Sequence, residues 1–407
     1  MLCLIKFLSE FYQRKLRILA QGRSETYEEA IEQYRKIFLA DLRYAKKECA
    51  ADECPYYSTC AIVRKDIIKI LENDIGKFFD EIRNVYLLWI DSKSQEAIER
   101  LKNLLEDYQL DHFGIHVKNF DVFFKGRISA ENLTKWDMFH IPFNKRYLIG
   151  NQRYSLTGQP IMYIGKSVID IAEELEVEEL ENFKVSTIQI PQEMKLYDLR
   201  NNILEDVADM DIDILLGEET EYGRNKFFKI ILASVCSFPR KQELKNYSFC
   251  EEYVLPQLLA QIVKNKKFDG ITYQSTKKFN NALDAIEKIE QFDFFYDSEF
   301  KDNIAVFTKI NEKHVYDKEL YDKINISVPI SVEKIELITM QELEDMKEEI
   351  NQTCKEQDKI TKADKIVSSF NRIYGKISYK QKPYMQTELG QLHMYHLYEV
   401  LHQILVS

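Results

Sequence analysis

The stretch MFHIPFNKRYLIGNQRYSLTGQPIMYIGKSVIDIAEEL, residues Met138 to Leu175, decides the fold prediction for this chain. Arg153 and Tyr154 come just before a turn at Gly158 to Pro160. A short apolar run, Ile161 to Ile164, follows this turn and predicts a β-strand. A cation, a tight turn and a strand therefore follow one another within a dozen residues.

A predicted helix completes the motif. Ser167 has the place of its N-cap, and the helix carries two adjacent carboxylates, Glu173 and Glu174. The guanidinium of Arg153 can bind phosphate with a planar fork of donors. A carboxylate on the helix can stabilise positive charge that develops on a ribose. These parts together predict a nucleotide site.

The composition limits the partners. The chain has 407 residues, of which 45% are hydrophobic and 30% charged, and its formal net charge is −11 with a pI of about 5.4. This length allows two or three domains. An acidic chain without a basic tail does not favour nucleic acid as its main partner.

The sequence also favours a cytoplasmic protein. The longest apolar run, Phe227 to Phe238, is too short to span a membrane. The N-terminal residues predict an amphipathic helix rather than a signal peptide, with a membrane-surface helix as the alternative. Seven cysteines are an odd number for a disulfide framework. Cys49, Cys54 and Cys60 lie close together, but their spacing favours buried or free thiols over a zinc site.

The predicted fold class is α+β, in three consecutive domains. Only two glycines, Gly22 and Gly76, precede Gly114, and residues 1–116 predict a helical domain. Its expected helices begin at a capping box of Thr26 and Glu29, run from about Ala61 toward Ile90, and run from Ser94 to Tyr108. Residues 117–338 predict a mixed sheet with interspersed helices, and residues 339–407 a C-terminal helical extension with helices at Gln341 to Glu356 and again after Pro383. The expected strands are Asp121 to Phe124, Ile161 to Ile164, Val185 to Ile190, Gly270 to Tyr273, Ile304 to Thr308 and, last, Val332 to Ile338.

Separated segments resemble one known family, the RES domain. They are FHIPF at 139–143, QRYS at 152–155, YIGKS at 163–167, EYVLPQLLAQ at 252–261 and DGITYQS at 269–275. Each motif alone is a weak signal, but their order along about half of the chain is more specific. The resemblance implies a core similar in fold to ADP-ribosyltransferase toxins, between an N-terminal helical domain and C-terminal helices. It also implies consumption of NAD, as in many bacterial toxins and anti-phage effectors.

The resemblance also implies the site residues. Its matched positions are Arg153, Glu174 and Ser275 as catalytic residues, with Arg127, Tyr154 and Tyr163 binding NAD, and no metal. Read singly, these residues are more ordinary: an ion-paired arginine, a solvated glutamate, a packed tyrosine or a turn serine. Glu173 stays an alternative to Glu174, because an alignment shifted by one residue selects it. His140 is expected to brace the site, whereas His393 and His396 are expected on a polar or partner-facing helix surface.

The expected function is cleavage of the bond between nicotinamide and ribose in NAD, by phosphorolysis or hydrolysis. NAD is then the substrate and inorganic phosphate a candidate co-substrate. The alternatives are ADP-ribosyl transfer to a protein and a non-catalytic protein that senses nucleotides. An inhibitory or trigger protein and self-association stay open as further partners.

Overall fold

The computed structural model describes residues 3–48, 57–203, 205–206, 209–210, 222–241, 248–276 and 302–406. Two compact units divide the chain. The first comprises Met1–Gly114, Gly150–Gln159 and Tyr197–Thr276, and the second comprises Ile115–Ile149, Pro160–Leu196 and Lys277–Ser407. Each unit is thus built from several separate segments, and the predicted division into three consecutive domains stays a prediction.

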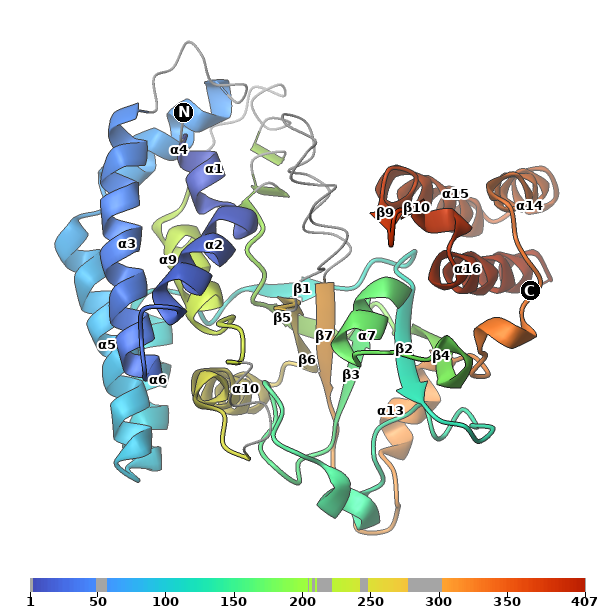
Figure 1. Ribbon diagram of the computed structural model, residues 1–407, viewed down its shortest axis with the longest axis horizontal. Helices are drawn as coiled ribbons and strands as arrows, with labels where there is room; N and C mark the ends of the chain where they lie inside the picture. Colours follow the sequence, from blue (N-terminus) through green and yellow to red (C-terminus); the bar gives the residue numbers. More distant parts are fainter. Residues whose placement is uncertain are drawn as a thin grey trace. The chain divides into compact units, whose positions relative to one another are not determined.

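The first unit is mainly helical (Figure 1). Its helices are α1 (Leu4–Leu8), α2 (Glu10–Gln21), α3 (Tyr27–Glu48), α4 (Tyr57–Ile68), α5 (Glu72–Ile90), α6 (Ser94–Asp107), α9 (Arg224–Val235) and α10 (Val254–Asn265). The predicted capping box before α3 is confirmed: the backbone N–H of Thr26 donates to Glu29, and the backbone N–H of Glu29 donates to the Thr26 hydroxyl, both at 3.4 Å.

One helix of this unit is interrupted where the sequence predicts continuity from Ala61 to Ile90. The chain is not helical between α4 and α5, because Leu71 adopts an extended conformation as the N-cap of α5. Two carboxylates, Glu72 and Asp74, lie in the first turn of α5, where they stabilise a helix N-terminus. The local charge pattern therefore favours a new helix over a continuing one.

One strand of the first unit, β6, leads directly to the candidate site residue Ser275. β6 (Gly270–Gln274) is buried along its whole length. The chain passes between the units within β1 (Gly114–His116) and β5 (Lys195–Asp198). The backbone N–H of Leu199 donates to the carbonyl of Thr272 at 2.9 Å, which fixes the chain after β5 against β6.

The second unit is built on antiparallel strands in the order β7-β3-β2-β4-β8. Their bounds are β2 (Phe123–Ile128), β3 (Ile161–Gly165), β4 (Phe183–Gln189), β7 (Asp302–Phe307) and β8 (Asn325–Ile326). The sequence predicted four of these strands, and Gly270–Gln274 in the first unit, to within a few residues. Together with the helices they make the chain mixed α and β, which agrees with the predicted α+β class.

Helices cover one face of this sheet (Figure 1). They are α7 (Val168–Glu174), α14 (Met340–Thr353), α15 (Gln357–Tyr374) and α16 (Glu388–Val406), and they share one hydrophobic core with Phe124 and Val185. Phe123 and Ile188 face the other side, in a second core with Met138, Phe139 and Met162. The second unit also contains α13 (Lys318–Lys323) and the short strands β9 (Ser378–Tyr379) and β10 (Lys382–Pro383).

Two predictions in the second unit are wrong. The last expected strand, Val332 to Ile338, is a 3-10 turn at Val332–Lys334 followed by irregular chain. Val332, Ile335 and Ile338 approach the helical core with a spacing of three, which a strand cannot provide on one face. His393 and His396 do not face solvent or a partner, because both are buried in that core beside Phe124. Burial lowers the pKa of His393 to about 3 and that of His396 to about 4.

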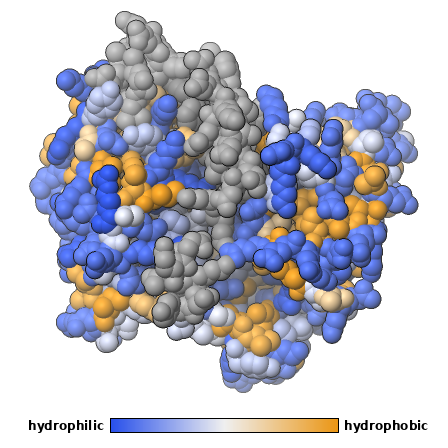
Figure 2. Space-filling model, in the orientation of Figure 1, coloured by the Kyte–Doolittle hydropathy of each residue, from blue (hydrophilic) through white to orange (hydrophobic). Residues whose placement is uncertain are grey.

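The cysteine prediction cannot be placed in this structure. Cys49, Cys54 and the side chain of Cys60 lie outside the described residues. Across the described ranges, no group of histidine, cysteine, aspartate and glutamate side chains is arranged to hold a metal ion. No helix there is long and apolar enough to span a membrane. Figure 2 shows hydrophilic residues over much of the face in view, with hydrophobic ones in separate groups.

Candidate functional site

The six predicted site residues fall into two groups, one in each unit. The first unit contains Arg153, Tyr154 and Ser275, and the second contains Arg127, Tyr163 and Glu174. Each group is therefore described within its own unit.

Arg153 is buried, and its guanidinium joins two segments of the first unit. Nη1 donates to the carbonyl of Cys236 at 2.8 Å, and Nη2 donates to the carbonyl of Phe238 at 3.0 Å. Nη2 also donates to the hydroxyl of Thr276 at 3.1 Å. The guanidinium carbon lies 4.8 Å from the ring centre of Tyr253. None of these contacts is with a carboxylate, so they orient the positive charge of Arg153 without neutralising it.

The loop that carries Arg153 is held by Gln257 of α10. The side-chain amide of Gln257 lies 2.8 Å from the carbonyl of Gln152 and 3.2 Å from that of Ser155, and donates to both. Tyr154 is buried, with its ring 4.4 Å from that of Tyr273. The sequence motif EYVLPQ contains Gln257, but no role was predicted for it. Two hydrogen bonds to main-chain carbonyls make it a positioning residue for the Arg153 loop.

Ser275 is buried at the end of β6, and its neighbour Gln274 fixes that end. The side-chain amide of Gln274 pairs with both main-chain groups of Asn201: its Oε1 accepts at 3.1 Å and its Nε2 donates at 3.3 Å. Because Thr276 accepts from Arg153, the chain on either side of Ser275 is anchored. The structure thus brings Arg153, Tyr154 and the Ser275 segment together.

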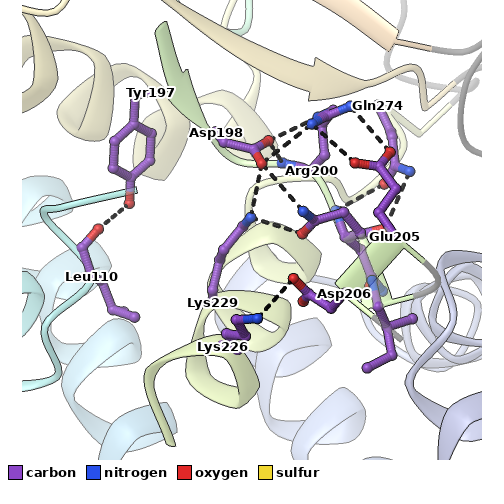
Figure 3. A network of polar contacts seen from close by, with 12 residues as sticks. Leu110, Tyr197, Asp198, Arg200, Glu205, Asp206, Lys226, Lys229 and Gln274 are labelled. Carbon is purple, nitrogen blue, oxygen red and sulfur yellow. Dashed lines mark hydrogen bonds and ion pairs between the residues drawn. The ribbon is translucent and has the colours of Figure 1, made fainter. Parts of the chain in front are cut away.

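A buried ionic network adjoins this segment (Figure 3). The carboxylate of Asp198, at the end of β5, accepts from Arg200 Nε at 2.8 Å and from Lys229 Nζ at 3.1 Å. Burial raises the pKa of Asp198, but Lys229 and Arg200 outweigh it and lower the pKa to about 2. Lys229 Nζ also donates to Asn202 at 2.8 Å. This network fixes the chain that Gln274 pairs with, and the sequence signal for it is Lys229 inside an apolar helix.

In the second unit, Tyr163 and α7 lie on the same side of the sheet. Tyr163 alternates along β3 with Met162 and Ile164, which belong to the core on the other side. α7 covers the Tyr163 side, since a methyl group added to Gly165 would lie 3.2 Å from Ile171 of that helix. Tyr163 and the two glutamates of α7 therefore belong to one face.

Glu173 and Glu174 differ in their surroundings. The carboxylate of Glu173 accepts a hydrogen bond from the hydroxyl of Tyr379 in β9 at 3.1 Å. Burial and the charge of Glu173 raise the pKa of Tyr379. Glu173 thus joins α7 to β9, and the choice between Glu173 and Glu174 stays a prediction. Consecutive helical residues point about 100° apart, so the two glutamates have different directions.

Arg127 projects from the opposite face of the sheet. It lies two residues after Lys125 and four after Phe123 on β2, so all three share the side of the core that contains Met162. Burial lowers the pKa of Arg127, while the nearby Asp137 acts in the other direction. Within the second unit, Arg127 and Tyr163 therefore lie on different faces, and their joint action on NAD stays a prediction.

His140 braces the segment that contains it. Its Nε2 accepts from the backbone N–H of Asp317 at 2.9 Å, and its Nδ1 lies 2.7 Å from the carbonyl of Ile141. A ring that accepts at Nε2 and donates at Nδ1 is neutral. Burial also lowers the pKa of His140, which keeps it neutral. Both nitrogens are used, so His140 is a bracing residue rather than a base.

Comparison with known proteins gives one partial relative. The protein named "Putative toxin YopC" from Bacillus subtilis (strain 168) is 33% identical to this chain over 177 residues. The match covers 42% of this chain and 39% of that protein, so the chain spans about two fifths of its relative's length. No protein-family model matches the chain. No solved structure matches it either.

Proposed function

We propose that this protein is a toxin-like enzyme of the RES type that cleaves the bond between nicotinamide and ribose in NAD. One observation carries the proposal: Arg153 and Thr276, 123 residues apart in sequence, are joined by a hydrogen bond. Thr276 directly follows the motif at 269–275, and the rings of Tyr154 and Tyr273, one from each motif, lie 4.4 Å apart, so the two separately matched motifs meet in one unit. The relative named a putative toxin supports a toxin-like role.

The proposed chemistry needs a cation, a carboxylate and a nucleophile. Nicotinamide leaves as a neutral group with the electrons of the broken bond, and the ribose gains oxocarbenium character. Glu174 stabilises this positive charge, and Arg153 attracts the pyrophosphate of NAD. Tyr163 or Tyr154 stacks on a ring of NAD, and Ser275 donates to a phosphate or ribose oxygen. The attacking oxygen of phosphate or water then forms the new bond to the ribose.

The test is nicotinamide release from NAD by the full chain and by Glu174→Gln. Loss of one electrostatic contact to a transition state lowers the rate by about 10²–10³. Glu178→Gln, an exposed change of the same kind just after α7, is the matched control and should keep the parent rate. Full activity in Glu174→Gln together with loss of activity in Glu173→Gln would show that Glu173, not Glu174, stabilises the charge on the ribose. No release by the parent protein would refute the enzyme.

Titration with phosphate separates the reactions. We place phosphorolysis ahead of hydrolysis, because arginines favour an anionic nucleophile. A rate that rises with phosphate and yields phosphorylated ADP-ribose supports phosphorolysis. Plain ADP-ribose at every phosphate concentration indicates hydrolysis, and transfer of label from NAD to protein indicates an ADP-ribosyltransferase.

A second candidate, a non-catalytic nucleotide sensor, is favoured by one observation. Both terminal nitrogens of Arg153 donate to acceptors within the protein, as in a structural arginine. A sensor binds NAD without releasing nicotinamide, so calorimetry with NAD beside the release assay distinguishes the two.

A further inference from the structure

Three cations occupy neighbouring positions on one face of the second unit's sheet. Lys125 and Arg127 are two residues apart on β2 and therefore point the same way. In the register of β2 with β4, Arg127 lies directly opposite Lys184, and directly opposite residues share a face. Like charges in such cross-strand positions repel one another and destabilise a sheet. We call Lys125, Arg127 and Lys184 the β2–β4 cation group.

No carboxylate compensates this group at ion-pair distance in the part of the chain that the structure describes. Neither Lys125 nor Arg127 has an ion pair or a side-chain hydrogen bond there. The ammonium of Lys184 donates to a main-chain carbonyl, that of Glu181, at 3.1 Å. No carboxylate among the described residues therefore neutralises the charge of this group by direct pairing.

The nearby carboxylates, Asp137 and Asp317, accept hydrogen bonds from groups other than the three cations. Asp137 acts on Arg127 through space, but its Oδ2 accepts from the backbone N–H and the hydroxyl of Thr134 at 2.8 and 2.7 Å. Asp317 accepts from two backbone N–H groups, those of Lys309 at 2.7 Å and Leu320 at 3.1 Å. Both carboxylates thus shape local turns instead of pairing with the cations.

We propose that the β2–β4 cation group binds a phosphate group. A phosphate dianion supplies several acceptor oxygens and two negative charges, which suit adjacent ammonium and guanidinium groups. The phosphate is either inorganic phosphate or part of NAD. This binding does not depend on cleavage of NAD, and it assigns Lys125 and Lys184 a role that the sequence motifs do not.

The lowered pKa values of Lys125 and Arg127 fit a site that gains stability when an anion binds. Burial, followed by the charge of Arg127, lowers the pKa of Lys125 to about 7, and burial also lowers that of Arg127. Both cations are thus held in surroundings that oppose their charge. A bound anion reverses this effect, so binding should draw energy from relief of the repulsion.

Aromatic side chains border the group and suit an organic part of a phosphorylated ligand. Tyr316 lies close enough to Arg127 to influence its charge. Trp136 lies 4.9 Å from Tyr316, stacks on Tyr321 with ring centres 3.7 Å apart, and is 39% exposed. Tyr321 belongs to α13 of the second unit. Such rings can stack on a base or on nicotinamide.

The test is calorimetric titration of the full chain with inorganic phosphate and, separately, with NAD at constant ionic strength. The variants are Lys125→Gln and Arg127→Gln. Loss of a charge-assisted hydrogen bond should weaken binding about tenfold or more. Lys365→Gln, an exposed lysine on α15 over the other sheet face, is the control with the same change of charge. Lys125→Arg should restore much of the affinity.

The two ligands identify the source of the phosphate. A loss of affinity for inorganic phosphate identifies a free anion, and a loss for NAD alone identifies a phosphate of NAD. Equal affinities in parent, Lys125→Gln and Arg127→Gln for both ligands would overturn the proposal. If the protein binds phosphate but releases no nicotinamide, the proposed NAD cleavage is refuted and the proposed phosphate site is still supported.

Stability against pH gives a second measurement that does not need a ligand. Because the folded pKa of Lys125 lies below its ordinary value of 10.5, the unfolded chain binds the proton more strongly between about pH 7 and 10.5. The free energy of unfolding should therefore rise with pH over this range, and rise less in Lys125→Met. Phosphate should raise the melting temperature of the parent more than that of Lys125→Met. Identical responses of the two proteins would contradict the proposal.

Discussion

The guanidinium of Arg153 connects the end of α9 with the end of β6, so Arg153 has a structural role besides its proposed role in ligand binding. Three acceptors in two segments receive its hydrogen bonds. The fork of a guanidinium reaches them together, whereas an ammonium is a compact point charge on a flexible stem. A single arginine therefore serves both the packing of the first unit and the proposed attraction of pyrophosphate.

We expect Arg153→Lys to be destabilising as well as weak in NAD binding. Carbonyls left without a donor in a buried site should cost about 1–3 kcal/mol in the free energy of unfolding. Urea unfolding of both proteins measures this cost, with Arg83→Lys on α5 as the control, a half-buried arginine without a hydrogen bond or ion pair among the described residues. If Arg153→Lys keeps the free energy of unfolding but loses NAD binding, Arg153 acts on the ligand alone. If both the free energy of unfolding and the affinity for NAD are unchanged, Arg153 is not part of the site.

The sequence marks Arg153 as a candidate residue but does not predict its hydrogen-bond partners. An arginine before a Gly-Pro turn is visible in the motif, but its acceptors come from Cys236, Phe238 and Thr276, which no local pattern connects to it. The same holds for Lys229 and Asp198, whose pairing depends on how α9 lies against the end of β5. Side-chain partners far apart in sequence follow from tertiary packing, so motif reading cannot supply them.

At the scale of elements, α7 packs on the sheet because β2 and β3 offer glycines beneath it. A methyl group added to Gly126 would lie 2.6 Å from Ile171 of α7 and 2.5 Å from the ring of Phe183. Neither contact is possible without displacement of a neighbour. Gly126 thus sets how closely the helix with Glu173 and Glu174 approaches the strands.

We therefore predict that Gly126→Ala destabilises the protein and displaces α7. Overpacking of a close-packed core typically costs about 1–3 kcal/mol. Chemical denaturation gives the loss, and hydrogen exchange of the α7 amides reports whether the helix moves. Gly150→Ala, where an added methyl group meets nothing within 4 Å, is the matched control. Equal stability of Gly126→Ala and the parent would show that the helix adapts without cost.

Elements with strong periodic and capping signals were predicted well, and elements that depend on context were not. α6 begins at Ser94 as expected and ends at Asp107, one residue short, because its apolar stripe and its boundaries are local features. The predicted strand at Val332 to Ile338 failed because its apolar residues serve a helical core. α15 (Gln357–Tyr374) was missed as a separate helix.

At the scale of the molecule, the N-terminal helices are part of the same compact unit as the Arg153 segment. The hydroxyl of Tyr27 donates to the carbonyl of Val235 at 2.6 Å, and the ring of Phe78 lies 4.9 Å from that of Phe228. From Phe227 to Val235, α9 is buried on all sides, as expected for a helix surrounded by protein. Its environment is completed by residues before Gly114.

A chain that begins at Lys118 should accordingly lose the fold of the first unit. Exposure of α9 would leave a large apolar surface in water, which favours unfolding or aggregation. Limited proteolysis should cut residues 224–265 rapidly in the shortened chain and slowly in the parent. A shortened chain that resists cleavage there and still releases nicotinamide would show that the helical region is dispensable.

The way the chain alternates between its units limits how the protein can have evolved by recombination. It passes from one unit to the other after Gly114, Ile149, Gln159, Leu196 and Thr276. The longest uninterrupted part of either unit, Lys277–Ser407, is under a third of the 407-residue chain, whereas the match to the Bacillus subtilis protein covers 42% of it. The matched stretch must therefore encode pieces of both units, wherever it begins. Neither unit can be exchanged between genes as one coding segment, so recombination would have to carry parts of the two together.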